Sequence, residues 1–192
     1  MKLISKISKG SYGYRNYRKK IQLTELAIGT AMILAQLLAR NFTDNQAARN
    51  ILTVMAILTV LPVANVASPF LASFPYSTPG KDFHKALLPY EEKCVILYEL
   101  IVTSKEQILP LDGVAVHPAG VCAYCSNPKT DISKAESYLN SMFTAHRLEG
   151  NVRVIKDFGT FERRLKGFKP ASAYEDDGSV DYAAELLKNL SM

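Results

Sequence analysis

The twenty-six residues from Asn50 to Pro75 contain no Asp, Glu, Lys, Arg or His. A helix needs about 20 predominantly apolar residues to cross the hydrocarbon core of a bilayer, and this stretch exceeds that length. A second apolar stretch, Ile21 to Ala39, precedes it and contains a single carboxylate, Glu25. Together the two stretches predict a transmembrane helical hairpin over residues 21–75.

The charged residues are unevenly distributed along the chain. Residues 1–20 contain seven basic residues and no acid, whereas residues 81–192 contain fourteen basic and sixteen acidic residues. The net charge of +5 therefore belongs to the N-terminal arm, and the basic pI does not indicate that the C-terminal part binds nucleic acid. We expect the arm, residues 1–20, to lie in the cytoplasm and to contact anionic lipid, with a disordered basic tail as the alternative.

The distribution of basic residues also predicts an orientation. The connection between the two apolar stretches carries only Arg40 and Arg49, whereas seven basic residues precede the first stretch. By the positive-inside rule, both termini lie in the cytoplasm. The three cysteines are odd in number and follow the hairpin, which favours a reducing compartment. A cleaved signal peptide is the rival interpretation of the first stretch, but the basic region is long and no cleavage site follows.

The first apolar stretch has an alanine at every fourth position, at Ala27, Ala31, Ala35 and Ala39. Residues at this spacing share one face of a helix, and small residues let a second helix approach closely in lipid. We therefore expect the alanine stripe to pack against the second span, where Ala56 and Ala64 are available.

The hairpin is followed by a linker, residues 76–81, because Ser, Pro and Gly gather there. Residues 82–170 then predict an α/β domain in the order α-β-β-β-α-β-α, and residues 171–192 an acidic link and a C-terminal helix. The strands are expected over residues 94–102, 108–117, 121–125 and 152–158. Ser133 with Glu136 has capping-box spacing for the middle helix, Gly150 is expected to end it, and Thr160 is expected to cap the next one.

Residues 110–125 read Pro-Leu-Asp-Gly-Val-Ala-Val-His-Pro-Ala-Gly-Val-Cys-Ala-Tyr-Cys. An aspartate, a Val-rich strand, a tight turn and a second strand in this order resemble the core of restriction-endonuclease-like nucleases, most closely the nuclease-related domain. The resemblance covers about a third of the domain by motif. It implies a restriction-endonuclease-like fold in which Asp112 would be a ligand of Mg²⁺.

The sequence departs from that family where its chemistry lies. The family has an acid, one spacer residue and then a lysine, whereas this chain has Cys125 and Asn127 at these two positions. Two carboxylates are needed to hold Mg²⁺, and a lysine to orient the attacking water. The domain is therefore expected to be catalytically degenerate. An active nuclease would have to use Asp112 with relocated residues, for which Glu99 and Lys129 are the candidates.

Cys122 and Cys125 form a CxxC pair, which can bind zinc when two further ligands join it. Residues three apart on a strand point to opposite faces, so the two sulfurs are not expected to meet one metal ion. No metal site and no cofactor is predicted; Mg²⁺ enters only under the nuclease alternative.

Basic residues gather near the end of the domain, at Arg153, Lys156, Arg163, Arg164 and Lys166. They predict contact with anionic lipid or with a phosphate backbone, and a merely solvated surface is the alternative.

These patterns predict a membrane-anchored binding or scaffolding protein, more an interaction module than an enzyme, with a protein or nucleic-acid partner in the cytoplasm. A membrane-tethered metal-dependent nuclease is the first alternative. The second is an accessory subunit whose hairpin packs against a larger membrane complex.

Overall fold

The computed structural model describes residues 7–170, 173–174 and 177–192, so Lys2 and Lys6 of the basic arm and part of the acidic link lie outside the described residues. The chain divides into two compact units. Residues 16–76 form a helical hairpin, and residues 1–15 join residues 77–192 in an α/β unit. The hairpin is thus an insertion in the sequence of the α/β unit.

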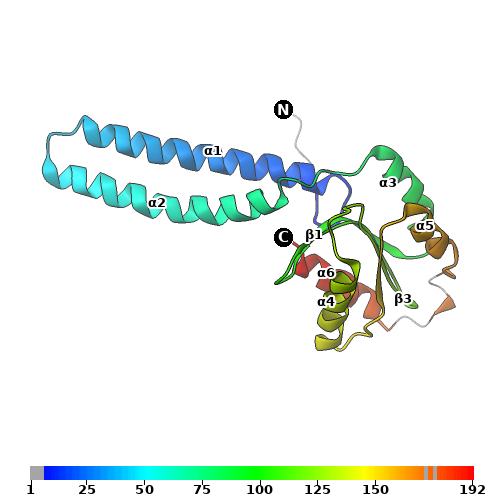
Figure 1. Cartoon of the computed structure of the whole chain (residues 1–192). Coiled ribbons are helices and arrows are strands. Elements are labelled where there is room, and N and C mark those ends of the chain that lie inside the picture. The colour runs from blue at the N-terminus through cyan, green and yellow to red at the C-terminus, as the bar shows by residue number, and fades with distance from the viewer. Residues whose placement is uncertain (1–6, 171–172, 175–176) are drawn as a thin grey trace. The chain divides into compact units, whose positions relative to one another are not determined.

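The hairpin consists of two long helices, α1 (Tyr14–Asn41) and α2 (Gln46–Ser73) (Figure 1). Each has 28 residues, and both are long and apolar enough to span a membrane. At 1.5 Å per residue each helix measures about 42 Å, more than the ~30 Å of a hydrocarbon core. The helix α1 begins seven residues earlier than its apolar stretch, directly after Gly13, whose φ of 90° interrupts the preceding backbone.

The two helices approach closely at a glycine, and the predicted contact of the alanine stripe is wrong. A Cβ added at Gly29 would overlap with Cγ2 of Val63. Gln36 lies two turns after Gly29 on α1, and Thr59 lies one turn before Val63 on α2. The side chains of Gln36 and Thr59 form hydrogen bonds with each other at 3.3 Å. The four alanines of the stripe and Ala64 are all exposed, although Ala56 is buried. Glycine has no side chain and so allows the close approach of α2. The alanines lie on another face of α1.

The α/β unit contains one mixed sheet with the order β1-β2-β3-β4. Its strands are β1 (Val95–Thr103), β2 (Ile108–His117), β3 (Gly120–Tyr124) and β4 (Val152–Ile155). The first three pair antiparallel, whereas β3 and β4 are parallel and are connected through α4 (Ile132–Ala145). The predicted order of elements is therefore confirmed as a small α/β domain after a helical hairpin.

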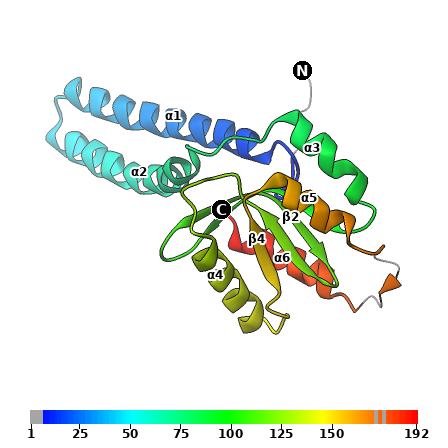
Figure 2. The ribbon, with the colours of Figure 1, turned by 45° about the vertical axis from the view of Figure 1, so that its right-hand side comes forward.

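Helices cover both faces of the sheet (Figure 2). On one face, α4 and α6 (Ser179–Leu190) bury a large core that includes Leu100, Leu139 and Leu187. On the other face, the short helices α3 (Lys81–Leu87) and η1 (Leu88–Tyr90) and the helix α5 (Phe158–Lys166) bury a smaller one that includes Leu87, Phe161 and Leu165.

Three predicted helix ends are wrong in detail. Asp131, not the Ser133–Glu136 pair, caps α4 by accepting the N–H of Lys134. Asp157 caps α5 by accepting the N–H of Thr160 at 2.7 Å, so the preceding strand ends at Ile155 and not at Phe158. The helix α4 ends at Ala145, well before Gly150. Ser133 and Thr160 lie within the first turns of α4 and α5, whereas the two aspartates hold the N-cap positions and accept the N–H groups three residues on.

Both edges of the sheet are occupied by the chain itself. At β1, the N–H of Tyr98 donates to the carbonyl oxygen of Gly10 at 2.7 Å, and the N–H of Met192 donates to that of Ile101. At β4, the N–H groups of Val152 and Val154 donate to the side chains of Asn140 and Glu136 of α4. A partner that adds a strand would have to displace these contacts.

Candidate functional site

Glu99 of β1 and Asp112 of β2 lie opposite each other at an irregular point of the sheet. The register of β1 and β2 passes from Tyr98–Gly113 to Leu100–Leu111 and omits this pair. Glu99 has a φ of 59°, which is rare for a residue with a side chain. Both carboxylates are buried, with Glu99 2% and Asp112 5% exposed. Strained backbone and buried charge at one place identify this as the candidate site.

Both strands change the side of the sheet that their side chains face at this point. Leu97 and Leu100 pack in the same core although they are three residues apart, and so do Leu111 and Val114 of β2. On a regular strand, residues three apart face opposite sides. The irregularity thus lets both strands keep apolar residues in the core while Glu99 and Asp112 turn toward the N-terminal segment.

The cation at this site is Arg15, which is 4% exposed. Its Nη1 lies 2.6 Å from Oδ1 of Asp112 and also donates to the carbonyl oxygen of Ser77. Its Nη2 donates to the carbonyl oxygens of Leu100 and Leu111 at 3.2 and 2.8 Å, and its Nε to that of Glu99 at 3.3 Å. A buried charge must be paired and hydrogen-bonded, and here every guanidinium nitrogen has an acceptor.

Glu99 holds the beginning of α1. Its Oε1 accepts the N–H of Gly13 at 2.7 Å, and its Oε2 accepts the N–H of Arg15 at 2.8 Å and the hydroxyl of Thr78 at 3.0 Å. The first N–H groups of a helix have no partner within the helix, and a negative charge near them is stabilising. The carboxylate of Glu99 therefore acts as a cap supplied from another part of the chain.

The second oxygen of Asp112 is held by Ser126, the second residue after the end of β3. Oδ2 of Asp112 accepts the N–H of Ser126 at 2.9 Å and its hydroxyl at 2.5 Å. We call Arg15, Glu99, Asp112 and Ser126 the Arg15 cluster. Sequence reasoning missed Arg15, which it counted with the lipid-facing arm, and Ser126. No local pattern marks either residue, because Arg15 and Asp112 are 97 positions apart.

The nuclease candidates Glu99, Asp112 and Lys129 are only partly brought together. Lys129 is exposed in the turn before α4, where its N–H donates to the side chain of Asn127. Within the described ranges, no three His, Cys, Asp or Glu side chains gather where they could hold a metal ion. The oxygens of Glu99 and Asp112 already accept hydrogen bonds from protein donors, so the pair as folded does not fit Mg²⁺.

The cysteines lie in two separate places. Cys122 packs on the α3 and α5 side of the sheet together with Cys94, whereas Cys125 packs on the α4 and α6 side. The expectation that Cys122 and Cys125 face opposite sides is confirmed. Burial raises the pKa of the Cys94 thiol to about 11, and burial likewise raises the pKa of Cys122. Such thiols are poor nucleophiles at neutral pH.

The predicted cationic residues Arg153, Lys156, Arg163, Arg164 and Lys166 are all exposed, on β4, the turn after it and α5. Several of them have partners within the domain. Lys166 lies 3.0 Å from Glu162, and Arg153 lies 3.6 Å from Glu136. Lys156 donates to the carbonyl oxygen of Pro128. Phosphate or lipid contact at this surface stays a prediction, and the neighbouring carboxylates weaken it.

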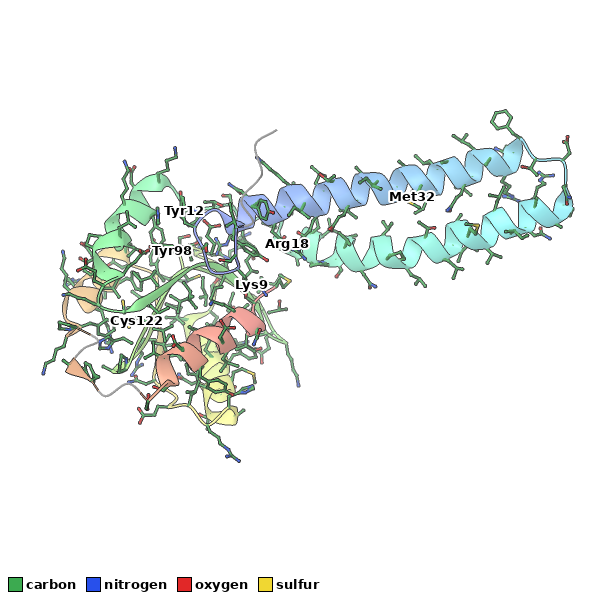
Figure 3. All side chains as sticks on the ribbon, turned by 180° about the vertical axis from the view of Figure 1, so that it is seen from behind. Lys9, Tyr12, Arg18, Met32, Tyr98 and Cys122 are labelled. Atoms are coloured by element: carbon green, nitrogen blue, oxygen red, sulfur yellow. The ribbon has the colours of Figure 1, made fainter. Side chains whose placement is uncertain are left out.

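The N-terminal segment from Lys9 to Arg15 packs along the α/β unit. The ring of Tyr12 stacks on His84 at 4.4 Å between centroids and lies edge-on to Tyr98 (Figure 3), and its hydroxyl donates to the carbonyl oxygen of Pro79. Nζ of Lys9 donates to the carbonyl oxygen of Ser191. Burial, and then the charge of Glu99, raise the pKa of Tyr12. The Arg15 cluster is thus the innermost part of a longer contact.

Comparison of the chain with protein-family models, with curated proteins and with solved structures finds no match. Function therefore has to be argued from the geometry of the Arg15 cluster and of the hairpin.

Proposed function

We propose that this chain is a membrane-anchored binding or scaffolding protein with two spans and both termini in the cytoplasm. Its α/β domain would have the core layout of a restriction-endonuclease-like nuclease-related domain without the ability to cleave. The observation that carries the proposal is the ion pair of Arg15 with Asp112. The aspartate on which the resemblance to the nucleases rests is neutralised by a cation from the chain itself.

The hairpin supports the membrane part of the proposal. Large apolar side chains are exposed along both helices, among them Leu34, Ile57 and Leu61. Lys20 and Arg40 bracket the apolar part of α1, and the nineteen residues between them span about 28 Å, close to the thickness of a hydrocarbon core. The seven basic residues before the apolar part of the first span favour a cytoplasmic N-terminus by the positive-inside rule.

Anionic lipid is the proposed ligand of the exposed basic residues beside α1. Arg15 is buried, and Lys9 bonds to the C-terminal end of the domain. Arg18 and Lys20 are exposed at the start of the span. They are the basic residues of the described arm that we expect to reach lipid headgroups.

A protein is the favoured cytoplasmic partner. The part of the chain from residue 81 onward has more acidic than basic residues, and the basic residues of β4 and α5 have carboxylates beside them. Nucleic-acid binding draws on a surplus of positive charge, which this domain lacks. We therefore expect no tight binding of nucleic acid, and the assay described next tests this expectation.

The test uses the full chain in detergent micelles, because residues 7–15 belong to the folded α/β unit. It is incubated with single- and double-stranded DNA and RNA in Mg²⁺ or Mn²⁺, beside Asp112→Asn. We expect no metal-dependent cleavage and no tight binding of either nucleic acid. Cleavage by the natural chain that Asp112→Asn abolishes would overturn the proposal and establish the nuclease alternative. Resistance of the hairpin to alkaline extraction from membranes tests the anchoring separately.

A further inference from the structure

An apolar groove runs along one side of the hairpin, between α1 and α2. Its walls include Ile28 and Met32 of α1 and Met55, Leu58 and Val66 of α2. Met32 is labelled on α1 in Figure 3. The close approach at Gly29 and Val63 forms part of its lining, and Glu25 is its one charged residue.

Glu25 lies inside the apolar part of the span. It follows Lys20 by five residues, which is about 7 Å along a helix. Its side chain is exposed, and among the described residues neither an ion pair nor a hydrogen bond to it is formed. Ionisable residues at such depth are costly unless they face a protein partner or a water-filled cavity.

A proline on the groove lining changes the backbone hydrogen bonding of α2. Pro62 lines it and has no N–H, so the carbonyl oxygen of Leu58, one turn earlier on α2, does not receive its usual helical hydrogen bond from residue 62. The ionised carboxylate of Glu25 and this carbonyl oxygen are both hydrogen-bond acceptors. An occupant that satisfies them must bring donors.

We propose that this groove binds a transmembrane helix of another protein that carries a lysine or arginine about one and a half turns inside its cytoplasmic end. The cation would pair with Glu25, while apolar side chains of the partner helix fill the space between Met32 and Met55. The inference rests on the proposed membrane anchoring and makes the chain an accessory subunit of a membrane complex.

Charge complementarity argues against a second copy of this chain as the occupant. Residues 21–39 and 50–75 contain no Lys, Arg or His, so the spans of a second copy have no cation to offer at the depth of Glu25. A lipid acyl chain could fill the apolar walls but would leave the carboxylate without a partner.

The experiment measures energy transfer between the full chain in phosphatidylcholine vesicles and a labelled synthetic helix of about 20 Leu and Ala residues. One peptide carries a lysine five residues from the end of its apolar segment, and the control peptide carries leucine there. We expect the lysine peptide to bind about tenfold more tightly, the size of a strong polar contact between helices in lipid. Glu25→Gln should remove the preference.

A matched variant separates the groove from mere charge. In the double variant Glu25→Leu with Leu23→Glu, the carboxylate moves about 3 Å toward the cytoplasmic end of α1, to a position that is 58% exposed and outside the groove lining. We expect this variant to lose the preference for the lysine peptide. Equal binding by this variant would overturn the proposal, and so would equal binding of both peptides by the natural chain.

Two further readouts are measured in parallel. The first is energy transfer between two labelled copies of the chain. If two copies associate more tightly than the chain binds the lysine peptide, and if Glu25→Gln leaves this association unchanged, the groove belongs to a second copy and the proposal is overturned. Release of the chain from the vesicles at alkaline pH would instead disprove the membrane anchoring itself, which distinguishes the two failures.

Discussion

The guanidinium of Arg15 and the carboxylate of Asp112 form a buried ion pair at 2.6 Å between residues that stand on either side of the hairpin in the sequence. Arg15 also donates to the carbonyl oxygen of Ser77, so the chain leaves the α/β unit and returns to it through neighbouring residues. The hairpin is therefore inserted into a domain, and the segments that precede and follow it are bonded to each other at the point of insertion through Arg15.

Replacing Arg15 by alanine should destabilise the α/β unit strongly. Removing one member of a buried pair leaves the other charge without a partner, which costs about 3–5 kcal/mol. The free energy of unfolding is measured by denaturation of the full chain in micelles, followed by circular dichroism. Arg18→Ala is the matched control, because Arg18 is exposed one turn later, and surface substitutions change stability by about 0.5 kcal/mol or less.

Arg15→Ala also tests whether the carboxylate oxygens around Arg15 can bind a metal ion when the guanidinium is removed. In Arg15→Ala, the carboxylates of Glu99 and Asp112 lose their cation. We expect Mg²⁺ at millimolar concentration to leave the melting temperature of this variant unchanged. A rise in melting temperature with Mg²⁺ in this variant, absent from the natural chain, would contradict this expectation and would show that Arg15 keeps a divalent ion away from Glu99 and Asp112.

The α/β unit should fold without the hairpin only if the N-terminal segment is kept. Because Arg15 contacts Ser77, a short Gly-Ser linker can replace residues 16–76. This protein should be soluble and should unfold cooperatively, whereas residues 81–192 alone should not, because Glu99 and Asp112 then lose Arg15. Size-exclusion chromatography and thermal unfolding compare the two. Equal stability of both would contradict the structural role of the segment.

Gly29→Ala should weaken the contact between α1 and α2. The added methyl group would overlap with Cγ2 of Val63, and overpacking of a close contact costs about 1–3 kcal/mol. Val63→Ala removes the overlapping atom, so the double variant should recover part of the loss. Unfolding in mixed detergent and dodecyl sulfate micelles provides the measurement. Ala31→Leu, on the exposed face of α1, is the control that should behave like the natural chain.

Cys94 and Cys122 should resist alkylation while the domain is folded. Burial raises the pKa of Cys94 to about 11, so at pH 8 about one thiol in a thousand is ionised. Iodoacetamide should modify both thiols only after denaturant is added. Rapid modification of the folded chain, detected by mass spectrometry, would contradict the buried positions of Cys94 and Cys122.

The raised pKa of Cys94 also has a consequence for stability. Folding favours the neutral thiol, so its contribution is fully present below the ordinary pKa of 9.0 and is lost as the pH rises toward about 11. Cys94→Ala should therefore reduce the loss of stability between pH 9 and pH 11. The free energy of unfolding of both proteins is measured by denaturant titration at each pH. The same pH dependence in both would show that the Cys94 thiol does not cause the loss of stability.

Much of the secondary structure could be predicted because it depends on local pattern. The length and the lack of charge of residues 50–75 predicted α2, and the turn composition at residues 118–120 helped to predict β2 with the bounds that it has, Ile108–His117. The helix caps were predicted less well, because several neighbouring polar side chains compete for the same N–H groups. Asp131 and Asp157 capture them through short-range geometry that spacing alone does not distinguish.

The sequence by itself determined the two apolar helices, the strands and the separate charge of the N-terminal arm, since each follows from residues close together in the chain. Only the tertiary structure decided that Arg15 is the partner of Asp112, that β1 and β2 change faces at Glu99 and Asp112, and that Gly29 and not the alanine stripe meets α2. These contacts join residues far apart in the sequence. They depend on how whole elements pack, because a buried charge or a close helix contact is stable only where the remote partner is brought to it.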